Sequence, residues 1–170
     1  AKNYLKEFFV IAQDAVCYQE NDIMLGLRYL NDLARKQGMP LVICVALGTS
    51  FGGHNGDSLL ADILDIYATV RNRCVVVGTG NEAARRHHYF NRFTDAQDMR
   101  TAEIRVGEGT QSFAVELWST LPNIVMVSVT SPSGERTGMI PIRLGYLFDF
   151  LFTFERTTIT VEYRLLQRNN

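Results

Sequence analysis

Apolar residues in the first half of the chain alternate between helical and strand periods. Between residues 22 and 37 they recur at helical spacing (Ile23, Leu27, Leu30 and Ala34) and predict an amphipathic helix. Asn21 or Asp22 is the expected N-terminal cap, and Gly38 is the expected stop. The continuous apolar run Leu41–Leu47 then predicts a short strand that is covered on both faces.

A second helix and strand follow a glycine-rich loop over residues 48–56. The helix is expected to begin near Asp57 or Ser58 and to reach Val70, and the next buried strand covers residues 74–77. Strand, helix and strand joined by short links form a βαβ unit, so the two strands should be parallel.

The pattern changes near Met99 to the alternation of β-strands. Strands are predicted over residues 103–106, 112–118, 124–130, 139–144 and 157–166, with a turn at residues 131–135. Their core should hold the aromatic side chains of Trp118, Phe148, Phe150, Phe152 and Phe154. The expected fold class is therefore α/β, a partial parallel sheet with helices followed by an antiparallel β region of sandwich or jelly-roll type. The expected domains are residues 1–98 and 99–170.

Composition narrows the class of protein. The 170 residues are 46% hydrophobic and 21% charged with a net charge of -1, which is typical of a soluble globular chain and argues against nucleic acid or a membrane as partner. No apolar run approaches the roughly 18 residues of a membrane span. The amphipathic N-terminus is not expected to be a signal peptide. Cys44 and Cys74 lie in apolar runs and are expected to be buried, reduced thiols.

Three histidines are candidates for metal or acid–base chemistry. His54 lies in the glycine-rich loop, where a solvated surface histidine is expected. His87 and His88 are adjacent, have no third ligand at suitable spacing and follow Arg85 and Arg86, which would repel a cation. We therefore expect packing or hydrogen-bonding roles for them, and no metal or cofactor.

Small residues follow both predicted parallel strands. Leu47 and Gly48 end the first, and Gly78-Thr79-Gly80-Asn81 ends the second. Sites in parallel sheets form beyond the carboxyl ends of the strands, so we expect the chemistry here. From the pattern alone, Asn81 is better explained as a turn residue that tolerates left-handed backbone.

Two segments together carry a resemblance to a known family. Val42–Gly48 and, some thirty residues later, Val75–Glu82 resemble subtilisin-like serine peptidases, in which a strand ending in Ser-Leu-Gly, a helix and a strand ending in Ala-Gly-Asn follow one another. The similarity extends from Asp22 to Tyr89. It is closest to the clostridial spore-germination branch, which inserts a β jelly roll between the oxyanion asparagine and the catalytic serine. The strands after Met99 resemble the beginning of that insert.

The resemblance implies a role for each matching residue. Asn81 corresponds to the oxyanion-hole asparagine, which would donate a hydrogen bond to the tetrahedral intermediate. Leu47 and Gly48 correspond to the edge that pairs with the substrate backbone. One wall of the specificity pocket corresponds to Gly78, Thr79 and Gly80. The implied partner is a peptide or protein substrate, the implied source is bacterial, and the implied location is spore-associated or secreted.

Two departures keep other functions open. Ala46 replaces the serine that the family has before Leu-Gly, and no segment resembles those of the catalytic Asp, His or Ser. The chain alone is therefore expected to be an inactive internal fragment. The alternative is a pseudoprotease or regulatory binding module on the same scaffold. A third reading is an α/β ligand-binding domain with a β appendage. The strand over residues 157–166 is the expected edge for a homodimer of the fragment.

Overall fold

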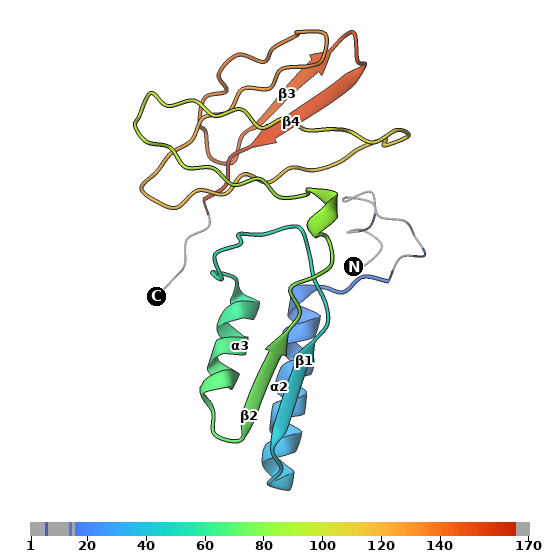
Figure 1. Ribbon diagram of the computed structural model, residues 1–170, viewed down its shortest axis with the longest axis vertical. Helices are drawn as coiled ribbons and strands as arrows, with labels where there is room; N and C mark the ends of the chain where they lie inside the picture. Colours follow the sequence, from blue (N-terminus) through green and yellow to red (C-terminus); the bar gives the residue numbers. More distant parts are fainter. Residues whose placement is uncertain (1–5, 7–13, 15, 166–170) are drawn as a thin grey trace. The chain divides into compact units, whose positions relative to one another are not determined.

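The computed structural model describes residue 6, residue 14 and residues 16–165 of the chain. Its contacts divide the chain into two compact units, Ala1–Trp118 and Ser119–Asn170. The first holds helices α2 (Glu20–Gln37) and α3 (Leu59–Thr69), strands β1 (Leu41–Val45) and β2 (Arg73–Val77), and the short helix η1 (Ala83–Arg85) (Figure 1). The second holds strands β3 (Leu147–Phe152) and β4 (Thr157–Glu162). The mixed α/β fold class is confirmed, and the domain boundary near Met99 stays a prediction.

Helix α2 begins two residues earlier than its periodicity predicts. Its N-cap is Gln19, whose side chain makes no capping hydrogen bond, and the expected cap at Asn21 or Asp22 is wrong. Asn21 Oδ1 instead accepts from the Asp22 amide, inside the first turn. The predicted stop is confirmed, because Gly38 adopts a left-handed φ of 64° that a side chain would disfavour.

Helix α3 receives caps from two parts of the sequence. Ser58, its N-cap, accepts a hydrogen bond of 3.0 Å from the Ala61 amide, as its position before the apolar period predicts. A carboxylate oxygen of Glu20, in the first turn of α2, accepts a second from the Leu60 amide at 3.0 Å. Amides at a helix N-terminus lack partners within the helix, so both oxygens satisfy the start of α3, and the Glu20 oxygen also joins α2 to it.

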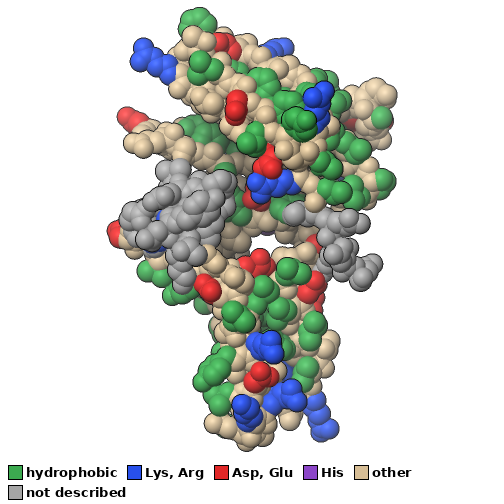
Figure 2. Space-filling model, turned by 180° about the vertical axis from the view of Figure 1, so that it is seen from behind, with side chains coloured by type: hydrophobic (Ala, Val, Ile, Leu, Met, Phe, Trp, Pro, Cys, Tyr) green, Lys and Arg blue, Asp and Glu red, His purple; other side chains and the backbone are tan. Residues whose placement is uncertain are grey.

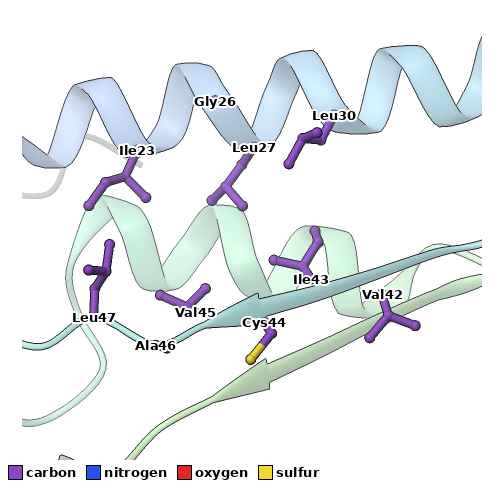
Figure 3. A pocket seen from close by; sticks show the side chains of 10 residues that line it. All are labelled: Ile23, Gly26, Leu27, Leu30, Val42, Ile43, Cys44, Val45, Ala46 and Leu47. Carbon is purple, nitrogen blue, oxygen red and sulfur yellow. The ribbon is translucent and has the colours of Figure 1, made fainter.

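Strands β1 and β2 pair in parallel, in a register from Leu41 opposite Arg73 to Val45 opposite Val77. This confirms the βαβ unit. The helices cover one face of the pair. Ile43 is buried and points toward α2, whereas Cys44 points away (Figure 3).

The other face of this sheet is open in the described part of the chain. Val42 is 68% exposed, and Cys44 and Cys74 are also exposed. The expectations of a strand covered on both faces and of buried thiols are therefore wrong. A continuously apolar strand is buried on both faces only where other elements cover both faces of its sheet. In the described residues, helices cover one face only.

The second unit is built on an antiparallel hairpin. Leu147 of β3 lies opposite Glu162 of β4, and Phe152 lies opposite Thr157. Phe148 and Phe150 are half-buried and Phe152 is buried, so the alternation predicted for this strand is confirmed. Two other aromatic side chains expected in the core are not there, because Phe154 is 80% exposed beyond the end of β3 and Trp118, in the first unit, is 49% exposed.

Several predicted strands are extended segments without a ladder. Residues 103–106 and 112–118 form no regular strand, and the segments 124–130 and 139–144 are joined by a single isolated bridge, Val127 to Ile140. Ile140 is completely buried, and the Tyr163 hydroxyl donates to its carbonyl oxygen while accepting from the Val127 amide. The turn at residues 131–135 is confirmed by hydrogen bonds of 2.8 and 3.0 Å that close it.

Hydrophobic side chains reach the surface of both units on the face shown in Figure 2. Exposed examples include Leu25 and Tyr29 of α2, at 62% and 67%, and Leu147 and Leu151 of β3, at 63% and 65%. No helix in the described residues is long and apolar enough to cross a membrane.

Candidate functional site

The candidate site lies where β1 and β2 end. The Gly78 amide donates a hydrogen bond of 3.2 Å to the Val45 carbonyl oxygen, one step beyond the last register pair. Because the strands are parallel, the segments that follow them leave the same edge of the sheet. The geometry therefore brings the exit of β1, Ala46–Gly48, to the same sheet edge as the exit of β2, Thr79–Asn81.

The exit of β2 needs glycine at one position. Gly80 has a φ of +77°, in the left-handed region, and a Cβ placed there would meet no atom within 4 Å. The constraint at Gly80 is therefore in its backbone and not in its packing. Asn81 follows in a bend and is exposed, and its side-chain amide has no hydrogen-bond partner among the described residues. That amide is available to a ligand.

A small charged cluster follows Asn81. Glu82 Oε2 lies 3.5 Å from Arg85 Nε and 3.3 Å from His87 Nδ1, and all three side chains are exposed or nearly so. Ion pairs in such positions contribute little to stability, typically below about 1 kcal/mol.

The two loops beyond the strands meet through histidines. The His54 ring, from the loop after β1, lies 4.7 Å from the His88 ring between centroids, at a tilt of 51°. Both residues are exposed. The described residues contain no group of three or more His, Cys, Asp or Glu side chains suited to a metal ion. Contact between rings agrees with the packing role expected for His88.

Sequence reasoning missed two residues beside the loop after β1. Glu116 Oε2 accepts a hydrogen bond of 2.7 Å from the Gly52 amide and one of 2.9 Å from Trp118 Nε1. They lie in the segment that was predicted as a strand of a separate β domain. A signal was present, since Trp118 is the only tryptophan and Gly52-Gly53 is the only Gly-Gly pair in the chain.

An open groove of about 570 Å³ runs between α2 and the free edge of β1, lined by apolar side chains such as Ile23, Leu27 and Leu47 (Figure 3). The Leu41 amide donates to the Asn72 carbonyl and the Val45 carbonyl accepts from the Gly78 amide, so both groups point toward β2. Backbone groups alternate in direction along a strand, so those of Val42 and Cys44 point the other way, toward the groove. Those groups have no partner in the described part of the chain. Unpaired backbone groups beside apolar walls suit an extended peptide segment.

The described residues of the candidate site present two kinds of hydrogen-bonding group. They offer one side-chain amide, at Asn81, and unpaired strand backbone that leads to Leu47 and Gly48. Gly78 lies beside β1 through its bond to Val45, and the roles of Gly78, Thr79 and Gly80 in binding stay predictions. Nucleophilic catalysis would need a serine, a base and an orienting acid in addition.

Comparison with known proteins gives one clear neighbour. No family model matches the sequence, and no curated protein matches it. Among solved structures, the chain is similar to the CspB protease of Clostridium perfringens, with a TM-score of 0.67 and 25% identical residues. The similarity covers 89% of this chain and 32% of that one. The chain thus has the fold of about one third of that protease, consistent with a partial subtilisin-like fold.

Proposed function

We propose that this chain is part of a subtilisin-like serine endopeptidase and carries its oxyanion-hole segment. Asn81 donates its side-chain amide to the oxyanion, Leu47 and Gly48 pair with the substrate backbone, and Gly78–Gly80 line the specificity pocket. The substrate class is a peptide or protein. The remaining catalytic groups come from the rest of a longer parent protein.

One observation carries this proposal. The segments bearing Gly48 and Asn81 leave the same edge of a parallel strand pair, and the Asn81 amide is exposed and has no partner among the described residues. Transition-state stabilisation requires such a donor to be held in place before reaction, without having to abandon another bond. Similarity to a solved protease over most of this chain supports the same reading.

The rival candidate is a pseudoprotease or regulatory binding module on the same scaffold. Ala46 favours it, because alanine stands where the family carries serine before Leu-Gly. The open groove beside β1 also suits a binding role without chemistry. The two candidates differ in whether the parent keeps a Ser–His–Asp triad.

Activity-based labelling tests the proposal. The 170-residue chain and the parent gene product that contains it are each treated with a fluorophosphonate probe and with a fluorogenic peptide. We expect labelling and turnover in the parent only, at a serine outside this chain. Labelling of any serine within the chain would contradict the proposal, and a parent that neither labels nor carries triad residues would establish the rival.

A further inference from the structure

The loop that follows β1 is anchored by a carboxylate far away in sequence. Glu116 Oε2 accepts hydrogen bonds from the Gly52 amide at 2.7 Å and from the Trp118 indole at 2.9 Å. One oxygen thus joins the loop backbone to an aromatic ring. Hydrogen bonds to a charged acceptor are stronger than those between neutral groups, so this oxygen is a strong fixed point for the loop.

The Gly52-Gly53 pair fits this anchor for two different reasons. Gly52 has a φ of +95°, which side chains rarely adopt, and this conformation presents its amide to Glu116. A Cβ at Gly53 would lie 3.3 Å from Trp118 Cε3 and 3.0 Å from Asn55 Oδ1. The first glycine therefore supplies backbone freedom and the second supplies room for the indole.

We propose that Glu116 is a positioning residue for the glycine-rich loop, acting together with Trp118, and that it thereby holds the peptide-binding segment Leu47–Gly48 in its binding conformation. The second part rests on the function proposed above. The loop begins directly after Gly48, and four of the nine residues from 48 to 56 are glycine. Such a segment has high conformational entropy when free, so a fixed point four residues beyond Gly48 restricts the exit of β1.

Loop order is measured in the 170-residue chain without any peptide. Glu116→Ala removes the acceptor, Glu116→Gln keeps an acceptor oxygen, and Glu103→Ala is the control because Glu103 is an exposed carboxylate of the same segment. We expect Glu116→Ala to speed hydrogen exchange of the Gly52 amide by about tenfold and to raise acrylamide quenching of Trp118. Since Trp118 is the only tryptophan, its emission reports on this contact alone. Glu116→Gln should recover most of the wild-type behaviour.

Peptide binding is measured in the parent protein with the same variants. Glu116→Ala should raise KM for a fluorogenic peptide about tenfold while kcat changes less than twofold, because the anchor affects substrate binding more than the chemical step. Unchanged Gly52 exchange and Trp118 quenching in Glu116→Ala would overturn the anchor. A loosened loop with unchanged KM would overturn its link to peptide binding. A parent without peptidase activity would overturn the proposed function instead, while the exchange data still decide the anchor.

Discussion

The Gly78 amide donates a 3.2 Å hydrogen bond to the Val45 carbonyl oxygen, and this bond holds the exits of β1 and β2 at one edge of the sheet. Beyond it one segment continues to Gly48 and the other to Asn81. The candidate site thus depends on backbone pairing at the strand ends and on the glycine conformations that follow them.

Gly80→Ala should destabilise the exit of β2. The left-handed φ of +77° costs an alanine about 1–2 kcal/mol, while the new methyl group meets nothing within 4 Å. Gly48→Ala is the matched control, since its methyl group also meets nothing and its φ lies outside the left-handed region. Urea unfolding of the two variants should differ by roughly that amount. Equal stability of both variants would show that the Gly80 conformation is not required.

The second unit should lose stability in acid through Glu155. Burial raises the pKa of this half-buried carboxyl, but hydrogen bonding from Ser133, whose amide donates to Glu155 Oε1 at 2.9 Å, outweighs it, so its pKa lies below the ordinary 4.5. A carboxyl whose pKa is lower in the folded than in the unfolded state stabilises the fold at pH values above its unfolded-state pKa. This stabilisation is lost as the pH falls through the folded-state pKa. Glu155→Gln should therefore be less stable than wild type at pH 7, and the difference should shrink as the pH falls below the ordinary carboxyl pKa of 4.5. A difference independent of pH in urea unfolding would contradict this.

Local signals in the sequence predicted the α/β half well. Helical periodicity placed α2 and α3, Ser58 and Gly38 marked two of their ends, and the short apolar runs placed the parallel strands. Each of these features depends on neighbours within a few residues or on the rule that two strands joined through a helix pair in parallel. Their success has a physical cause, since caps and turns are fixed by local hydrogen bonding.

Burial and the long-range contacts were not predictable in the same way. Phe113, Val115 and Leu117 alternate as in a strand, yet they are 55%, 62% and 59% exposed, because a strand forms only where a partner strand pairs with it. Cys44 was expected to be buried and is exposed because no described layer covers that face. The bond between Glu116 and Gly52 spans 64 residues and follows from no local pattern.

We propose that the isolated chain self-associates through its β half as a two-fold dimer. Leu147 and Leu151 of β3 are 63% and 65% exposed and Phe154 in the following turn is 80% exposed, and apolar surface of this kind favours association. The rival is a monomer protected by charged edge residues such as Glu162 and Arg164, which form an ion pair at 2.5 Å. Size-exclusion chromatography with light scattering over a tenfold concentration range should show a dimer that Leu151→Lys weakens. A monomeric mass at every concentration would contradict the proposal.

Asn81 is proposed to stabilise the oxyanion in the parent enzyme, and steady-state kinetics of Asn81→Ala measure that role. Removing such a donor lowers kcat by about 10²–10³ with KM little changed, a magnitude established for subtilisin itself. Asn91→Ala is the control, because Asn91 is an exposed asparagine of the same unit whose hydrogen bonds are local. We expect the loss of kcat in Asn81→Ala alone. A kcat within twofold of wild type for Asn81→Ala would contradict the account.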